Sequence, residues 1–479
     1  MRNIILIITD TFRYDNLGDR CAAMPVRTPC LDAFAADRAT DVHGFYTGSF
    51  PTIPQRTDLA TGRVGWPHYG WQPVDQSGRN HIASILRGAG YATQLLCDCP
   101  HLFPSRFDQG FEAAYHLRGQ EGDTPILHLN DPIPLVMPHE KTRIAPMRRG
   151  HTLADLHAWT NRSPRYEAEM FPIRTADTAV RWLEENHKAG PFFLWIDFFD
   201  PHEPWDPPEY LVRRYDPDYD GPPMVHPNYG PSSVYTGAEL RNLRAHYAAE
   251  AELVDRGIGR TLQKVDDLGL WDETVVVVTS DHGISLGEHN RTGKSNITEA
   301  DRRWWPIYPE ISHIPFLVAA PGVAGGSGLN LLAQPVDALP TLLDLAGVEA
   351  APPEPFHGRS FADALRGGRE SHRPCAVSGC YADSPDGAAP ARCSTPFVIT
   401  ERWGYAPIGA TGGEELYDLH ADPLASHDIG SANPEVVREM RDLLDEHLRD
   451  AGADDRAIRL WTDGGRSGGA WARDYLPNG

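Results

Sequence analysis

Short runs of hydrophobic residues without polar alternation recur along the chain. Such runs are typical of strands covered on both faces of a sheet, and they predict buried parallel strands at residues 4–8, 92–96, 192–199, 275–279 and 315–320. Between them, apolar positions at helical spacing predict helices over residues 80–89, 174–187 and 236–268. Strands that alternate with helices indicate an α/β fold, with a mostly parallel central sheet flanked by helices.

Two stretches break this pattern. Residues 121–170 are rich in Pro, His and Arg without periodicity, and residues 201–235 carry many Pro and Tyr residues. Loops of this length are usually functional lids or disordered segments, and the aromatic content of the second favours an ordered lid.

After residue 350 an APPEP linker is followed by short strand patterns and an amphipathic helix pattern. We therefore expect a catalytic domain over residues 1–365 and a smaller α+β domain over residues 366–479.

Composition narrows the classes of partner. The 479 residues carry 44 Lys plus Arg against 66 Asp plus Glu, a formal net charge of −22, which speaks against coating nucleic acid or an anionic membrane. We find no secretory signal and no apolar stretch of about 20 residues, so we expect a cytoplasmic protein without a membrane anchor. Seven scattered cysteines predict reduced thiols rather than a disulfide framework. The sequence is compatible with a homo-oligomer.

Candidate metal ligands follow several predicted strands. Asp10, Asp98 and Asp200 stand at the ends of three of them, and Asp281-His282 follows a fourth. A single Asp there is commonly only a helix N-cap, but ligands of open α/β sheets bind at the carboxyl ends of the strands. Two carboxylates and an imidazole favour one Mn²⁺ or Zn²⁺ ion over Ca²⁺, which prefers oxygen ligands.

A candidate nucleophile lies in GSFPTIPQRTDLATGR, residues 48–63. Pro51 and Pro54 bracket Thr52, and residues 57–62 resemble the start of a helix. Threonine at a helix start is usually a cap, but a hydroxyl there is also favoured as a nucleophile because helix-start N–H groups stabilise oxyanions. Arg56, one turn on, would hold a second oxygen of the same anion.

Taken in order, these motifs resemble the sulfatases and their relatives in the alkaline phosphatase superfamily. The similar segments are DTFRYDNLG (10–18), TIPQR with LATGR (52–63), DPHEP (200–204), TVVVVTSDHG (274–283), GEHNRTGK (287–294), PVDALPTLLDLAG (335–347) and ELYDLHADP (415–423). The resemblance covers nearly the whole chain and implies the sulfatase-like fold, with a central mostly parallel sheet and a smaller C-terminal domain.

Three positions depart from the sulfatase pattern. Thr11 replaces the usual second Asp, Thr52 replaces the Cys or Ser that is oxidised to formylglycine, and His282 replaces the Asn of many members. Oxidation of threonine would give a ketone, so the formylglycine aldehyde cannot form. The Asp/Asp/His part of the ligand set resembles phosphonate monoester hydrolases. With threonine included, it resembles lipoteichoic acid synthases and phosphoethanolamine transferases, so the resemblance implies chemistry at phosphorus.

The resemblance also implies a role for each matched residue. Asp10, Thr52, Asp281 and His282 would hold one divalent cation, and Thr52 would attack a small anionic ester. Arg56 and Lys294 would hold non-bridging oxygens, while His202 would protonate the leaving oxygen or later activate water. The remaining candidate substrate contacts are Thr11, His68 and His313, of which His313 is either a ligand contact or a core histidine.

Three other functions remain open at this stage. The chain could be a sulfuric ester hydrolase that uses Thr52 directly. It could be a phosphoryl transferase, although the relatives of that kind are membrane-anchored. It could also be a non-catalytic protein that binds an anion, against which the intact set of Asp10, Arg56, Asp281, His282 and Lys294 argues.

Overall fold

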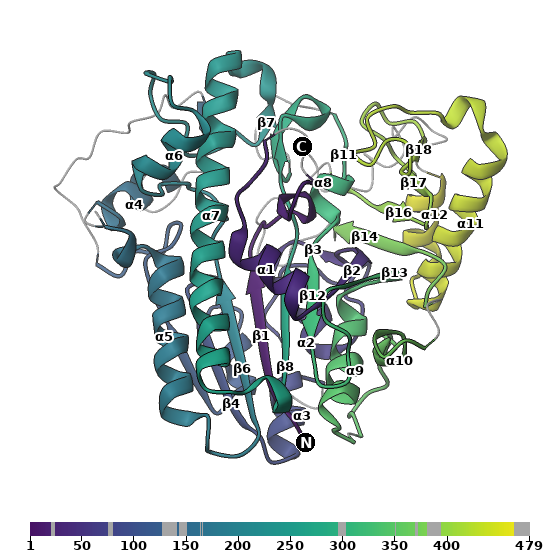
Figure 1. Ribbon diagram of the computed structural model, residues 1–479. Helices are drawn as coiled ribbons and strands as arrows, with labels where there is room; N and C mark the ends of the chain where they lie inside the picture. Colours follow the sequence, from purple (N-terminus) through teal and green to yellow (C-terminus); the bar gives the residue numbers. More distant parts are fainter. Residues whose placement is uncertain are drawn as a thin grey trace.

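The computed structural model describes most of the chain (Figure 1). The described residues are 1–20, 24–74, 80–126, 141–142, 151–162, 164, 166–295, 303–349, 351–368, 372–380 and 394–463. Among the cysteines, Cys21 and Cys393 lie outside these ranges, and none of the five described ones forms a disulfide. No helix in the described ranges is both long enough and apolar enough to span a bilayer.

The core of the fold is an eight-stranded sheet with the order β13-β2-β12-β8-β1-β6-β4-β5. All neighbouring strands are parallel except at β12, which runs antiparallel to both β8 and β2. The strands of this sheet are β1 (Asn3–Thr9), β2 (Thr40–Phe45), β4 (Ala92–Cys97), β5 (Ala113–His116), β6 (Phe192–Phe198), β8 (Thr274–Ser280), β12 (Phe316–Ala319) and β13 (Ser327–Ala333).

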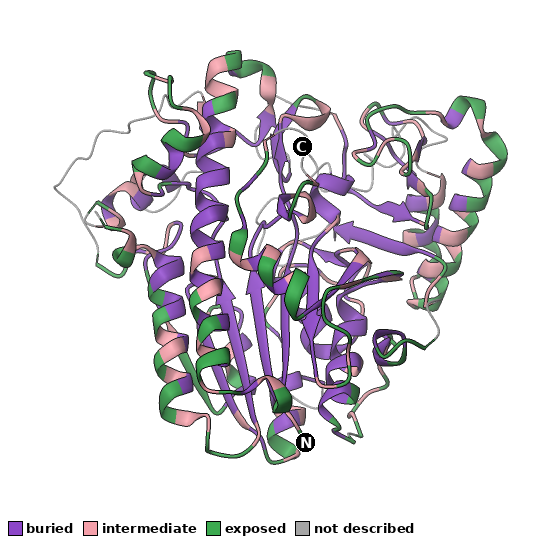
Figure 2. Ribbon diagram, in the orientation of Figure 1, coloured by how far each residue is buried: buried purple, intermediate pink, exposed green. Residues whose placement is uncertain are grey.

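Helices cover both faces of this sheet, as the hydrophobic pattern predicts. Alternate residues of β1 point to opposite faces, because successive side chains of a strand do so. Ile4, Leu6 and Ile8 join one hydrophobic cluster with α2 (Thr52–Thr61), α3 (Ile82–Gly88) and α9 (Pro335–Ala346). Ile5 and Ile7 join another with α1 (Pro29–Asp37), α5 (Phe171–Asn186) and α7 (Gly237–Asp267). The central strands β1, β6 and β8 are buried throughout, whereas the edge strands β5 and β13 are partly exposed and α5 and α7 expose their outer faces (Figure 2).

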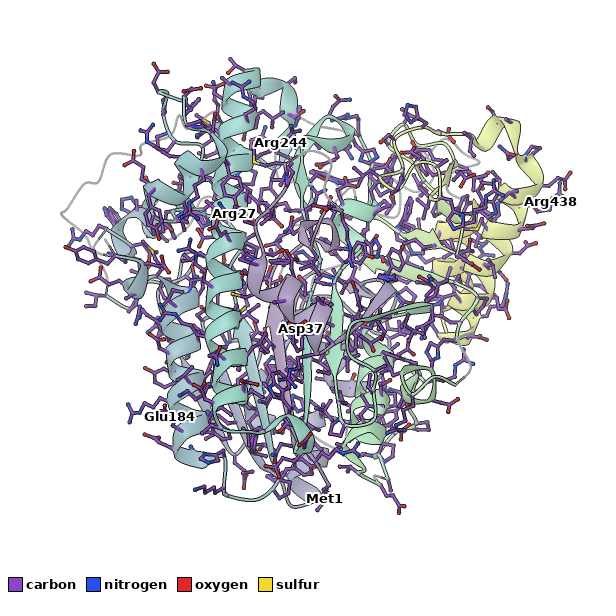
Figure 3. All side chains as sticks on the ribbon, in the orientation of Figure 1. Met1, Arg27, Asp37, Glu184, Arg244 and Arg438 are labelled. Atoms are coloured by element: carbon purple, nitrogen blue, oxygen red, sulfur yellow. The ribbon has the colours of Figure 1, made fainter. Side chains whose placement is uncertain are left out.

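The two long helices α5 and α7 pack against each other and are joined by polar contacts. Glu184 of α5, labelled in Figure 3, forms an ion pair with Lys264 of α7, with 2.8 Å between Glu184 Oε1 and Lys264 Nζ. Arg244 of α7, labelled in the same figure, donates from Nε to the carbonyl of Leu286 at 2.7 Å. These contacts tie α7 to α5 on one side and to the loop that follows β8 on the other.

Sequence and structure agree for the five predicted strands and three predicted helices, with end points within a few residues. One expectation was wrong: the run at 315–320 forms β12, which is antiparallel rather than parallel. A run of apolar residues predicts burial but carries no information on strand direction. Also, α2 begins at Thr52 rather than near residue 57.

The C-terminal part of the chain builds a second, five-stranded sheet with the order β18-β17-β16-β14-β3. Its strands are β3 (Ser49–Phe50), β14 (Ala376–Cys380), β16 (Phe397–Ile399), β17 (Trp403–Ala406) and β18 (Glu415–Asp418), and α11 (Pro434–Asp450) and α12 (Asp455–Asp463) accompany it. The edge strand β3 is separated from Thr52 by Pro51 alone. Division of the chain at residue 365 stays a prediction.

Short elements complete the fold. They are β7 (Gly230–Pro231), β9 (Ser285–Leu286), β10 (Arg291–Gly293), β11 (Trp305–Pro306), β15 (Ser394–Thr395), α4 (Leu153–Thr160), α6 (Glu209–Tyr215), α8 (Pro309–Ser312) and α10 (Ala362–Leu365). The segment 201–235 is folded, with Trp205 and Met224 fully buried. Of the expected insert 121–170, residues 127–140, 143–150, 163 and 165 lie outside the described residues. The lid function of both segments stays a prediction.

Candidate active site

Three candidate metal ligands meet at the carboxyl ends of two neighbouring strands. β1 and β8 are parallel and pair Thr9 with Ser280, so Asp10 lies beside Asp281 where the two strands end. One ligand atom each from Asp10, Asp281 and His282 lies within 4.8 Å of the others, and all three residues are fully buried. The shared strand edge thus brings together residues that are 271 positions apart in the chain.

The spacing of these atoms fits a cation better than direct hydrogen bonds. His282 Nε2 lies 3.5 Å from Asp281 Oδ2 and 3.9 Å from Asp10 Oδ1. Ligands bound at about 2.1 Å to one ion stand roughly 3 to 3.5 Å apart. His282 Nε2 and Asp10 Oδ1 are buried and have no hydrogen-bond partner among the described residues. Buried polar atoms are rarely left in this condition, so the chemistry of the group fits a divalent metal.

The pKa shifts of Asp10, Asp281 and His282 also fit a divalent metal. Burial, and then repulsion from Asp281, raise the pKa of Asp10 well above its usual value. Burial alone would also raise the pKa of Asp281, but His282 and Arg56 lower it below its usual range. Burial lowers the pKa of His282 to about 3, so its imidazole is neutral near pH 7 and able to donate a lone pair. A bound cation would favour the ionised form of both carboxylates.

Two unusual backbone positions set the ligand geometry. Thr11 has a positive φ of 61°, which directs its N–H to Asp281 Oδ1 at 3.0 Å and leaves its buried hydroxyl without a hydrogen-bond partner in the described chain. Non-glycine residues rarely adopt this conformation. Gly283 lies so close to the carbonyl of Glu310 that a Cβ would stand 2.2 Å from that oxygen. Both positions hold the chain in the turn that aims the ligands.

Thr52 is the first residue of α2. Its N-cap residue is Pro51, with extended backbone and no side-chain cap. Thr52 is therefore not the N-cap, and its buried side chain is not used to close the helix. The first N–H groups of a helix carry partial positive charge and bind anions. The role of Thr52 as a nucleophile stays a prediction.

Arg56 is placed differently from the sequence expectation. It is fully buried and donates from Nη1 to Asp281 Oδ2 at 2.6 Å, to Asp10 Oδ2 at 3.3 Å and to the Thr52 carbonyl at 3.2 Å. Its Nε and Nη2 are bound to Asp197. The guanidinium therefore joins the carboxylates to the first turn of α2, and it faces protein oxygens rather than an open substrate position.

Lys294 and His202 complete the group that the structure brings together. Lys294 Nζ is buried, lies 3.7 Å from Asp10 Oδ1 and has no hydrogen-bond partner in the described chain. His202 stacks on Phe199 and directs Nδ1 to the carbonyl of Glu203 at 2.6 Å. Burial, followed by the charge of Lys294, lowers the pKa of His202 well below its usual value. With Nδ1 protonated, Nε2 of His202 is a proton acceptor.

Two expected substrate contacts lie elsewhere. His68 is exposed, hydrogen-bonds through Nε2 to the carbonyl of Ala451 at 2.5 Å and lines a separate cavity with the C-terminal half of α2. His313 stacks between Tyr14 and Tyr46, and its Nε2 donates to the His43 carbonyl at 2.7 Å. Burial lowers the pKa of His313 to about 3. His313 is thus a half-buried histidine held by two tyrosine rings and the His43 carbonyl, and we do not retain His68 as a substrate contact.

Sequence reasoning missed Asp197 and Gln55. Asp197 lies inside β6 and accepts two hydrogen bonds from Arg56 at 2.9 and 2.8 Å. Gln55 is fully buried and donates to the Ser280 carbonyl at 3.4 Å, while its Oε1 has no partner in the described residues. An acid inside the apolar run FFLWIDFF was a readable signal for Asp197, because buried charges need partners. No comparable signal marked Gln55.

The sequence matches the sulfatase family over residues 2–348. The chain belongs to the sulfatase family. It is 26% identical over 478 residues to an arylsulfatase of Clostridium perfringens, covering 92% of each chain.

Solved structures share the fold. A phosphonate monoester hydrolase of Agrobacterium radiobacter superposes with a TM-score of 0.71 at 23% identity, covering 94% of this chain and 96% of that one. A 2-O GAG sulfatase superposes with a TM-score of 0.66 at 20% identity, covering 95% and 96%. The protein is a sulfatase-family hydrolase, enzymes of this family bind a divalent metal, and Asp10, Asp281 and His282 form a buried cluster in this chain.

Proposed function

We propose that this sulfatase-family protein hydrolyses a phosphodiester, a phosphonate monoester or a phosphate monoester through a covalent phospho-Thr52 intermediate. The observation that carries the proposal is the position of Thr52 on the first turn of α2. There, Arg56 Nη1 binds the Thr52 carbonyl together with the carboxylates of Asp10 and Asp281. The backbone of this helix-start residue is thus held by the same guanidinium group that binds two of the candidate metal ligands.

The threonine side chain favours phosphorus over sulfur. A formylglycine hydrate can expel its sulfate by using its second hydroxyl, but an ester of threonine has no such hydroxyl. The threonine ester must instead be cleaved by attack of water at the central atom. Phosphoryl chemistry of this two-step kind is a general route for covalent catalysis.

The chain's own residues supply the steps. The Thr52 hydroxyl oxygen attacks phosphorus in line, the bond from phosphorus to the leaving oxygen breaks, and the proton of the Thr52 hydroxyl is taken up by the leaving oxygen, which departs as the alcohol. Lys294 and the N–H groups at the start of α2 neutralise the non-bridging oxygens. Water then attacks the phospho-threonine and Thr52 leaves as the alcohol. His202, neutral with Nε2 unprotonated, is suited to accept the proton of this water.

Asp10, Asp281 and His282 would hold one divalent cation, with Thr52 as the fourth ligand. When bound, such an ion lowers the pKa of a hydroxyl and neutralises charge on a phosphoryl group. The imidazole in the ligand set favours Mn²⁺ or Zn²⁺ over Ca²⁺. Removal of metal by a chelator should stop turnover, and Mn²⁺ or Zn²⁺ should restore it. Restoration by Ca²⁺ alone would contradict the proposed ligand set.

A second candidate function is hydrolysis of sulfuric esters with Thr52 as the direct nucleophile. It is favoured by the 26% identity to a protein named arylsulfatase over 92% of each chain. We rank it second because a sulfated threonine lacks the release step that formylglycine provides.

A matched substrate panel separates the two functions. Aryl phosphodiester, aryl phosphonate, aryl phosphate and aryl sulfate with the same phenol leaving group should be compared by kcat/KM. Our proposal expects one of the three phosphorus esters to exceed the sulfate ester, and to lose all measurable turnover in Thr52→Ala. A higher kcat/KM for aryl sulfate would establish the second function instead.

A further inference from the structure

A second cluster of carboxylates lies apart from the Asp10, Asp281 and His282 group. Asp200, Asp206 and Glu250 line a cavity of about 30 Å³ together with Gln120 and Asn161. Three apolar residues, Pro164, Met170 and Phe171, complete the lining. Its volume suits one water molecule or one ion and is too small for an organic ligand.

Two of the three carboxylates, those of Asp200 and Glu250, are buried, whereas Asp206 is 47% exposed. Asp200 and Glu250 are each only 4% exposed. Asp200 Oδ2 accepts from Gln120 Nε2 at 2.8 Å, and Asp206 Oδ2 lies 3.1 Å from His157 Nε2. None of the described residues that line the cavity is a lysine or arginine.

Glu250 provides the observation that points to a ligand. Its Oε2 is buried at the cavity and has no hydrogen-bond partner among the described residues. A buried carboxylate oxygen without a donor is unfavourable unless the group is protonated or paired with a cation. Burial, and then repulsion from Asp200 and Asp206, raise the pKa of Glu250 well above its usual value. The cavity therefore holds either a proton shared among repelling acids or a cation.

We propose that this cavity binds one Ca²⁺ ion through Asp200, Asp206 and Glu250, with Gln120, Asn161 and water as further oxygen donors. All the donors would be oxygen atoms, which Ca²⁺ prefers, and no histidine or cysteine lines the cavity. Unlike Asp10, Asp281 and His282, the three carboxylates do not each have an oxygen within 4.8 Å of an oxygen of both others. A Ca²⁺ site does not require three protein oxygens in such close contact, because donors on opposite sides of this ion lie about 4.6 to 5.2 Å apart and several ligands can be waters.

The position of the cavity gives the ion a structural role. Asp200 and Asp206 flank the segment that carries His202, and Glu250 lies in the middle of α7. One ion bound to all three would fix both ends of the His202 segment to the long helix. It would hold the imidazole in place without contacting the substrate.

The test is thermal unfolding of the full chain, first stripped of metal and then loaded with Mn²⁺ at the Asp10, Asp281 and His282 group. Added Ca²⁺ should raise the unfolding midpoint by about 3 °C at one hundred times its dissociation constant. Glu250→Gln should abolish this rise, because it removes one of the three charges that hold the ion. The rise should persist in Asp281→Asn, which separates this site from the catalytic group.

Glu252→Gln is the matched control. Glu252 lies two residues along the same helix, is 3% exposed, and pairs with Arg214 and Arg256 outside the cavity. This variant should be less stable than the wild type yet keep the full Ca²⁺-dependent rise.

The proposal is overturned if Ca²⁺ does not raise the midpoint of the wild type, or if Glu250→Gln keeps the rise. If Glu250→Gln does not fold, the Ca²⁺ content of Asp281→Asn after equilibrium dialysis decides the matter. One Ca²⁺ per chain supports the site, and none overturns it.

Discussion

Asp197 of β6 accepts two hydrogen bonds from Arg56 of α2, from Nε to Oδ2 at 2.9 Å and from Nη2 to Oδ1 at 2.8 Å. Both side chains are fully buried. The paired arrangement fixes the guanidinium so that Nη1 reaches Asp10 and Asp281 at the candidate metal centre. Asp197 thus determines where the buried positive charge stands relative to the metal ligands.

Asp197→Asn is expected to weaken metal binding and catalysis. Loss of this carboxylate leaves the positive charge of Arg56 less balanced, and a cation beside it is then repelled more strongly. We expect roughly a tenfold loss in metal affinity and a loss of about 3 kcal/mol in the free energy of unfolding. Metal titration and urea denaturation measure the two effects, and an unchanged metal affinity would contradict this role of Asp197.

Thr11 offers a test that separates backbone strain from side-chain chemistry. Its positive φ of 61° is unfavourable for any residue with a Cβ. Thr11→Ala keeps this strain and removes the hydroxyl, whereas Thr11→Gly removes both. Thr11→Gly should therefore be more stable than Thr11→Ala by about 1 kcal/mol.

Activity of the same two variants tests the hydroxyl. If Thr11 Oγ1 contacts the substrate, both variants should lose the same factor in kcat/KM, because neither carries a hydroxyl. Full activity in Thr11→Ala would show that the residue matters only for backbone geometry.

Gly283→Ala is expected to disturb the metal ligands. The added Cβ would stand 2.2 Å from the carbonyl oxygen of Glu310, so the backbone beside Asp281 and His282 must shift. We expect at least a tenfold loss in metal affinity, measured by titration of the metal-free protein. Gly88→Ala is the matched control, because nothing lies within 4 Å of its Cβ position in α3. That control should be neutral or stabilising by about 0.5–1 kcal/mol.

His289 should make stability depend on pH above neutrality. Burial alone would lower its pKa, but contacts with Glu310 and the Ala425 carbonyl raise it to about 9. The folded pKa lies above the unfolded value near 6.5. The stabilisation is therefore complete below about pH 6.5 and is lost as pH rises through 9, with a size of about 3 kcal/mol.

This pH dependence is measured by urea denaturation of the wild type and His289→Asn between pH 6 and 10. The difference in free energy of unfolding between the wild type and His289→Asn should decrease as pH rises from 6 to 10. If this difference in free energy of unfolding stays constant from pH 6 to 10, His289 contributes through packing on Tyr308 rather than through its charge.

Much of the sheet could be predicted because its central strands are continuous apolar runs. The same regularity predicted that Asp10, Asp281 and His282 converge, since parallel strands share one carboxyl edge. β2 and β13 were missed because TDVHGF and SGLNLLA mix polar residues and glycine with the apolar ones. A one-dimensional pattern shows neither strand direction, as for β12, nor which charges pair.

The partners of buried charges depend on tertiary contacts. Arg56 was expected to face a substrate anion, but Asp10, Asp197 and Asp281 surround it. His68 was expected as a candidate substrate contact, yet its Nε2 hydrogen-bonds to the Ala451 carbonyl in the C-terminal part. Neither outcome is encoded in the spacing of the local sequence.

The central claim is that Thr52 becomes phosphorylated during turnover. The most direct measurement is rapid acid quenching of the metal-loaded protein with an aryl phosphodiester, followed by mass spectrometry of the peptide that contains residue 52. We predict a phosphoryl or phosphodiester adduct on Thr52 that forms at least as fast as turnover and is absent in Thr52→Ala. Wild-type rates in Thr52→Ala, or an adduct on another residue that forms and decays at the turnover rate, would contradict the account.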